Sequence, residues 1–188
     1  MDHIEQWAKE KFQNTEESEI SDEINNSVLE EKKLEEMIIA EKREQIISEA
    51  TKYIWIKYQY QSANPKVWFD CSGFINYVLS TVLNKKNNEI PRSTKMIYQQ
   101  YWKYRVSPDY AETGDIVLFL NKSWAPYHAE FLTHVDLKNK ELTCIGSASR
   151  NERAPDWSIY KPWVDERTRD FDKQKYLIID MKKMMKRW

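Results

Sequence analysis

The pattern of hydrophobic and polar positions separates a charged N-terminal stretch from a longer, more apolar remainder. Apolar residues recur at helical spacing from Leu34 to Ile54, which predicts an amphipathic helix. A capping-box pattern places the start of this helix at Ser27, after an acidic arm that is loosely ordered or partly helical. We therefore expect residues 1–42 to form a charged, partly helical extension and residues 43–188 to form the main domain. The charged half of the helix is interpreted as solvated, with a docking surface for a protein partner as the alternative.

Two helical patterns precede several strand patterns in the main domain. Helical spacing follows Asp70 as far as about Asn84, and a second helix is predicted from Thr94 to about Lys103. The order of helices and then strands predicts an α+β fold, with N-terminal helices packed on a small antiparallel sheet. The strand-like runs are residues 116–120, 127–137 and 142–149, with 176–181 closing the sheet, and an aromatic loop at 156–163 lines a cleft.

Composition narrows the class of protein. The 188 residues carry a net charge of −1 and are 31% charged, which suits one domain with an appendage and argues against nucleic-acid binding. No window approaches a membrane span of roughly 18 apolar residues, and the N-terminus lacks a signal-peptide pattern. We expect a cytoplasmic chain as encoded, unless it leaves the cytoplasm by another route. The two cysteines, Cys71 and Cys144, have no metal-site spacing, and a disulfide between them would remove a nucleophile.

Cys71 is the strongest candidate for chemistry. It follows Asp70, a natural N-cap, and therefore falls on the first turn of a predicted helix. The unpaired N–H groups and the helix dipole there favour a thiolate, and the same N–H groups could hold an oxyanion. A buried, inert cysteine is the alternative.

The run Asp-Cys-Ser-Gly-Phe at 70–74 resembles the nucleophile motif of the NlpC-type cell-wall cysteine peptidases, which have a papain-like fold. The resemblance implies hydrolysis of an amide in a peptidoglycan stem peptide, at a bond involving γ-D-glutamate and a diamino acid. It also implies a thioester mechanism that requires no metal and no cofactor. Similarity continues, with gaps, over about residues 43 to 181.

Further segments match the same family and suggest binding residues. Tyr58 begins a run that resembles the family's Tyr-x-Tyr loop, although the glycine pair that normally follows is missing. By position Tyr58 would border the oxyanion site, with a core aromatic as the alternative. Asp70 and Ser72 flank the nucleophile and are assigned to substrate binding. Arg92, in a segment similar to Leu-Pro-Arg-Ser, is a candidate for holding a substrate carboxylate, with a surface salt bridge as the alternative.

The general base and its partner are less defined. His128 and His134 both lie in one predicted strand, where alternation places them on the same face together with Glu130. The family pattern His-Val-Gly-Ile-Tyr favours His128 as the base. The family's third catalytic residue, usually in a His-Ala-Ser context, corresponds to Ser147 in this sequence. A serine would stabilise an imidazolium less than a charged or amide group would, so an inactive binding module is a second hypothesis. An acyltransferase or deamidase is a third.

Overall fold

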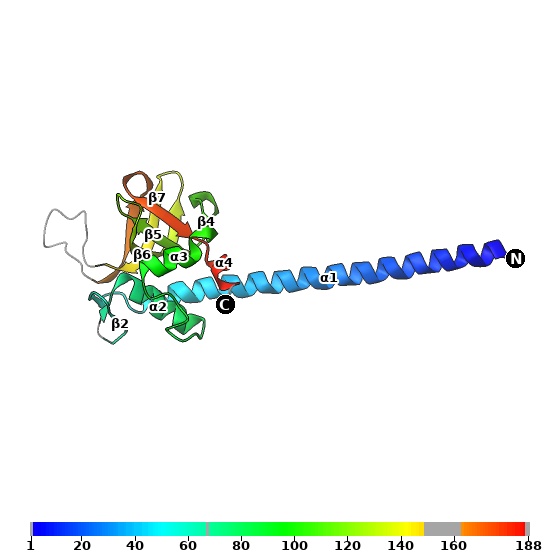
Figure 1. Cartoon of the computed structure of the whole chain (residues 1–188), viewed down its shortest axis with the longest axis horizontal. Coiled ribbons are helices and arrows are strands. Elements are labelled where there is room, and N and C mark those ends of the chain that lie inside the picture. The colour runs from blue at the N-terminus through cyan, green and yellow to red at the C-terminus, as the bar shows by residue number, and fades with distance from the viewer. Residues whose placement is uncertain (1, 67, 149–162, 187–188) are drawn as a thin grey trace. The chain divides into compact units, whose positions relative to one another are not determined.

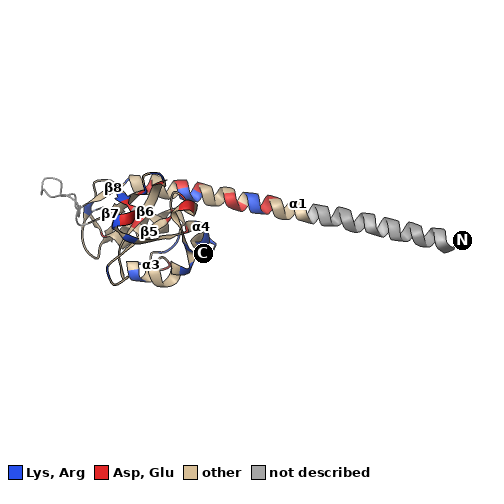
Figure 2. Ribbon diagram, turned by 90° about the horizontal axis from the view of Figure 1, so that it is seen from above, with Lys and Arg blue, Asp and Glu red and all other residues tan. Residues whose placement is uncertain are grey.

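The computed structural model describes residues 2–66, 68–148 and 163–186, with side chains from residue 25 onward. The chain divides into two compact units, Met1–Ala40 and Glu41–Trp188. Helix α1 (Asp2–Thr51) makes up the first unit and contributes its last residues to the second. In the described side chains of this helix, acidic and basic residues alternate, as Figure 2 shows. No helix in the described chain combines the length and apolar character that a membrane span requires.

The predicted start of α1 at Ser27 is wrong, because the helix already begins at Asp2. Its sequence contains no glycine or proline between these two points and is rich in glutamate, which is a good helix former. The capping-box pattern at residues 27–30 therefore lies inside a helix and caps nothing. At its other end α1 stops at Thr51, before Ile54, the last residue of the predicted helical pattern.

The second unit is built on a six-stranded sheet in which every neighbouring pair of strands is antiparallel. The strand order is β4-β9-β5-β6-β7-β8. Strand β9 lies between β4 and β5, so the expectation that it closes the sheet is wrong. The segment 156–162, predicted to be a cleft-lining loop, lies outside the described residues. The strands are β4 (Arg105–Val106), β5 (Ile116–Leu120), β6 (Pro126–Asp136), β7 (Glu141–Ser147), β8 (Val164–Asp170) and β9 (Lys175–Ile179).

Helices α2 (Cys71–Val82) and α3 (Thr94–Tyr101) contact the sheet through β6 (Figure 1). Phe74 of α2 packs edge-on against Phe131 of β6, with ring centroids 6.0 Å apart. The main core extends from this contact, and a smaller cluster around Phe119 and Cys144 occupies the other face of the sheet. This arrangement confirms the predicted α+β architecture. Short elements complete it: β1 (Lys57–Tyr58), β2 (Ala63–Asn64), β3 (Trp68–Phe69) and α4 (Met181–Met185).

A buried ion pair links the end of α1 to the sheet. Arg43 Nη1 lies 2.6 Å from Asp115 Oδ1, and the Arg43 Nη2 atom lies 3.3 Å from Asp180. Asp115 also accepts hydrogen bonds from the backbone N–H groups of Glu112 and Met181. These contacts fix the start of strand β5. We call Arg43, Asp115 and Asp180 the Arg43 cluster.

Candidate active site

Cys71 is the first residue of α2, and the local sequence accounts for its position. Asp70 has extended backbone angles (φ −90°, ψ 175°), and its side chain accepts from the N–H of Gly73 at 2.6 Å. The Asp70 N–H donates to the carbonyl of Ser62 at 2.8 Å, which brings the preceding loop onto the helix end. Any side chain at Gly73 would clash with that carbonyl, so glycine is required there. Cys71 and Cys144 are both free and form no disulfide with each other.

Asp70, Ser72 and Arg92 form one network on the wall beside Cys71. The two terminal nitrogens of Arg92 lie 2.9 and 2.8 Å from the two carboxylate oxygens of Asp70. The Ser72 hydroxyl donates to Asp70 at 3.1 Å and accepts from Arg92 at 3.1 Å. The guanidinium fork of Arg92 is therefore directed at Asp70. Its predicted role in binding a substrate carboxylate stays a prediction.

The structure brings His128 to Cys71. His128 lies near the start of β6, its side chain is 14% exposed, and its ring stacks on Phe119 with centroids 5.7 Å apart. Burial alone would lower the pKa of His128. The neighbouring Glu130 carboxylate and a side-chain hydrogen bond with Cys71 outweigh burial and raise the pKa. The two groups of the predicted dyad are thus in contact.

Glu130 also belongs to this site, although its sequence context predicted only that it shares a strand face with His128. Its Oε1 atom lies 2.9 Å from His128 Nε2, and its side chain is fully buried. Arg169 of β8 binds both carboxylate oxygens, at 2.7 and 3.2 Å, and Arg167 lies 3.6 Å away. Although burial favours the protonated form, His128 and Arg169 together lower the pKa of Glu130. We call Glu130, His128, Arg167 and Arg169 the Glu130 cluster.

Gly146 makes room for the Glu130 side chain. Phe131 pairs with Ile145 across β6 and β7, which places Glu130 opposite Gly146. A Cβ atom at Gly146 would lie 2.5 Å from Glu130 Cγ and 3.0 Å from its Cβ, closer than packed carbon atoms approach. The absence of a side chain at this position of β7 is therefore a condition for the buried carboxylate.

Ser147 and His134 occupy other places than predicted. The Ser147 hydroxyl is buried and donates to the carbonyl of Phe69 at 2.9 Å, whereas the imidazole of His128 faces Glu130. His134 is exposed, and it pairs with Thr143 after a β-bulge that separates it from Leu132. Because the extra residue reverses the alternation, His134 does not share the face of His128 and Glu130. The expectation of one common face was wrong for this reason.

A cleft of about 520 Å³ opens beside Cys71. Burial and the nearby Cys71 and Asp70 raise the pKa of Tyr58 to about 12, which keeps its hydroxyl protonated as a donor at neutral pH. Within the described chain, no group of three or more His, Cys, Asp or Glu side chains is arranged to hold a metal. The residues that line the cleft are Tyr58, Tyr60, Gln61, Asp70, Cys71, Ser72, Arg92, Ser93, Thr94, Pro126 and Tyr127.

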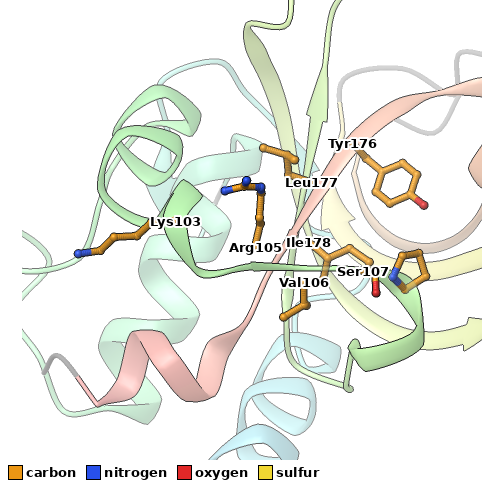
Figure 3. A pocket seen from close by; sticks show the side chains of 8 residues that line it. Lys103, Arg105, Val106, Ser107, Tyr176, Leu177 and Ile178 are labelled. Atoms are coloured by element: carbon orange, nitrogen blue, oxygen red, sulfur yellow. The ribbon is translucent and has the colours of Figure 1, made fainter.

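A second pocket of about 570 Å³ lies along β4 and β9, away from Cys71 (Figure 3). Its basic side chains contact neighbouring rings: Arg105 lies over Trp102 and Lys103 over Tyr104, both at 5.0 Å from the ring centroid. Figure 3 shows these side chains at one end of the pocket and Tyr176 at the other. None of the cleft residues contributes to it.

The fold and this site define a papain-like α+β domain with a cysteine at a helix N-terminus. A sequence profile of the NlpC/P60 family matches residues 56–152, about half of the chain. The chain therefore belongs to the NlpC/P60 family, a family of cell-wall hydrolases.

Comparison with individual proteins agrees with this assignment. The P60 domain of the antigen MAP1272c from M. avium paratuberculosis has a similar fold, with a TM-score of 0.54 at 13% identity, over 78% of this chain and 97% of that one. An NlpC/P60 family protein from Bacillus cereus ATCC 10987 gives a TM-score of 0.53 at 13% identity, over 72% and 39% of the two chains. The γ-DL-glutamyl hydrolase of Bacillus subtilis (strain 168) is 35% identical over 78 residues, which are 40% of this chain and 17% of that protein.

Proposed function

We propose that this protein is a cysteine peptidase that hydrolyses γ-glutamyl amide bonds in peptidoglycan stem peptides. The observation that carries the proposal is the contact between Cys71, at the start of α2, and His128 of β6, beside an open cleft. A thiol that is only a core residue would have neither an imidazole partner nor access to a cleft.

The first half of the reaction forms a thioester. The Cys71 thiolate attacks the amide carbon, and the carbonyl oxygen becomes an oxyanion. The N–H groups of Cys71 and Ser72 are among the first of α2, which have no acceptor within the helix, and with the Tyr58 hydroxyl they are suited to bind that oxygen. His128 then donates its proton to the leaving nitrogen, the carbon–nitrogen bond breaks, and the amine departs.

The second half regenerates the enzyme. His128, now neutral, removes a proton from a water molecule that attacks the thioester carbon. The carbon–sulfur bond breaks, the acid product leaves, and the imidazolium faces a thiolate again. In each cycle His128 gives one proton to the leaving amine and receives one from water, so the starting protonation state is restored.

Three observations support this substrate class. The NlpC/P60 family assignment supports a cell-wall peptide, and the name of the B. subtilis relative supports a γ-glutamyl bond. The cleft presents a carboxylate, Asp70, next to the nucleophile, which favours a substrate with an amine close to the cleaved bond. Asp70 would bind that amine, while Arg92 holds the Asp70 carboxylate in place.

The experiment compares purified wild type with C71A, H128Q and H134Q on stem peptides containing γ-D-glutamyl-diamino acid, with a γ-DL-glutamyl oligomer as second substrate. We expect cleavage of the stem peptide by wild type and H134Q. C71A and H128Q should fall to background, a loss of roughly 10⁴-fold or more. H134Q is the matched control because His134 is exposed and lies beyond the bulge.

Other outcomes discriminate the remaining hypotheses. Preferential cleavage of the γ-DL-glutamyl oligomer would support the Cys71–His128 mechanism but contradict the proposed stem-peptide substrate. No cleavage of either, together with rapid iodoacetamide labelling of Cys71, would favour a thiol acyltransferase or deamidase. No cleavage and slow labelling would favour a binding module and overturn the proposal.

A further inference from the structure

We propose that Glu130 is the positioning residue of this site: its carboxylate, held by Arg169 and Arg167 of β8, orients His128 toward Cys71 in place of Ser147. The inference rests on the proposed function, because it names the group that completes the Cys71–His128 pair. The residue that orients the imidazole would then lie on β6, the same strand that carries His128.

The geometry assigns each nitrogen of the imidazole. Nε2 donates to Glu130 Oε1 at 2.9 Å, so Nδ1 is the nitrogen that exchanges a proton with Cys71. Stacking on Phe119 fixes the plane of the ring. With one nitrogen and the plane fixed, His128 has a single productive orientation.

The arginines give Glu130 a fixed place and charge. A carboxylate buried without partners would take up a proton and lose its value as an acceptor. Arg169 contacts both of its oxygens, and Arg167 lies within 3.6 Å of one of them. Arg167 Nη1 also donates to the carbonyl of Gly146 at 3.1 Å, which ties β8 to the strand position opposite Glu130.

The charged and titratable groups around His128 come from four elements. Cys71 is contributed by α2, Glu130 and Tyr127 by β6 itself, Cys144 by β7, and Arg167 and Arg169 by β8. Cys144 is completely buried, and burial raises the pKa of its thiol well above the usual value, so it is uncharged at neutral pH. Glu130 is the carboxylate of this set, and it is the group that His128 Nε2 contacts.

The direct test is the titration of His128 in wild type and E130Q, followed by NMR of isotope-labelled histidine. The chain contains only three histidines, and H128Q identifies the relevant signal. We expect the His128 pKa to fall by at least one unit in E130Q, because the anion at Nε2 is removed. E166Q is the matched control, since Glu166 is an exposed carboxylate on β8, the strand that carries Arg167 and Arg169. An unchanged His128 pKa in E130Q would overturn the inference.

Kinetics provide the second measurement. E130Q should lower kcat about 10- to 100-fold with little change in KM, since the variant does not touch the cleft. The alkaline limb of the rate profile should move to lower pH together with the His128 pKa. E166Q should leave both parameters and the profile unchanged. A fall in kcat without any displacement of the profile would mean a structural role only, and would contradict the inference.

Two further variants keep the test decisive if E130Q folds poorly. E130D retains the charge for the arginines but shortens the reach, so it should fold and still lose part of the His128 pKa shift. G146A places a methyl group against Glu130 Cγ and should reproduce the E130Q profile without altering a titratable group. Normal kinetics and titration in G146A would argue against the assignment.

The titration separates this inference from the proposed function. A wild type that cleaves no stem peptide but shows a His128 pKa dependent on Glu130 would refute the substrate and keep the positioning role. Cleavage of the stem peptide together with a His128 pKa that does not depend on Glu130 would keep the proposed substrate and refute the positioning role.

Discussion

Two buried acid–arginine clusters lie in the main domain, and their difference separates structure from chemistry. In the Arg43 cluster, Asp115 is 1% exposed and contacts Arg43 at 2.6 Å. In the Glu130 cluster, Glu130 is fully buried and contacts Arg169 at 2.7 Å. By distance and burial alone the two pairs are equivalent.

Their remaining partners differ. Asp115 accepts its other hydrogen bonds from the backbone N–H groups of Glu112 and Met181, which do not titrate. Glu130 also contacts His128, whose pKa is raised to about 9 and whose ring contacts Cys71. A buried ion pair therefore indicates function when the carboxylate has a further, titratable partner that contacts a residue of a cleft. Otherwise it is a structural link between elements.

The largest expected effect concerns stability and comes from the Arg43 cluster. R43M leaves Asp115 buried without its cation, which we expect to lower the free energy of unfolding by about 3–5 kcal/mol. Urea denaturation of the two proteins measures this difference. The folded fraction of R43M should keep the wild-type kcat, because none of its contacts reaches Cys71.

The matched control for R43M is E112Q. The Glu112 carboxylate lies 3.3 Å from Arg43 Nε but is 65% exposed, so its loss should cost only about 0–1 kcal/mol. A comparable loss in both variants, or a fall of kcat in folded R43M, would remove the distinction between the two clusters.

The second prediction concerns the pH dependence of stability and belongs to the Glu130 cluster. Folding raises the pKa of His128 from 6.5 to about 9, so protonated His128 stabilises the fold fully below pH 6.5. That contribution is lost as the pH rises through about 9. For the single His128–Glu130 interaction we expect a contribution on the order of 1–3 kcal/mol.

Denaturation of wild type and E130Q at pH 5.5 and 9.5 checks this sign. The stability difference between the two proteins should be larger at pH 5.5, where the imidazolium faces a carboxylate only in wild type. On the acid side the pKa of Glu130 is lowered from 4.5 to about 2, so its contribution is retained above pH 4.5 and declines below it. A difference that grows toward pH 9.5 would contradict the assigned ion pair.

Much of the fold was predictable from local patterns. The apolar run at 116–120 and the amphipathic helix after Asp70 are visible because packing imposes regular periods on them. Strand β8 was missed because it presents arginine, not aliphatic residues, to the Glu130 side of the sheet, with Glu166 and Thr168 between. Because inward-facing and outward-facing residues of β8 are both polar, the strand shows no alternation of hydrophobic and polar residues.

The same limit explains what was missed in the site. Asp70 and Cys71 are neighbours in sequence, and His128 is placed by a family pattern, so all three could be found. Glu130 was visible as a residue two positions after the base, where the family pattern has glycine. Its importance depends on arginines of a strand that no periodicity revealed, 37 to 39 residues further along the chain by numbering (167 − 130 and 169 − 130). Contacts over such separations are set by tertiary packing, not by local sequence.

The smallest expected effect decides which residue orients the base. Ser147 was the sequence-based candidate, yet its hydroxyl donates to the Phe69 carbonyl at 2.9 Å and so joins β7 to β3. S147A should cost about 1 kcal/mol of stability for this buried hydrogen bond, with kcat within about twofold of wild type. S80A is the matched control, since the buried Ser80 hydroxyl donates within α2 to the Asn76 carbonyl, remote from the cleft residues. If S147A instead lost kcat as E130Q is expected to, Ser147 would act on His128 and the Glu130 cluster would be only a second structural link, no different in kind from the Arg43 cluster.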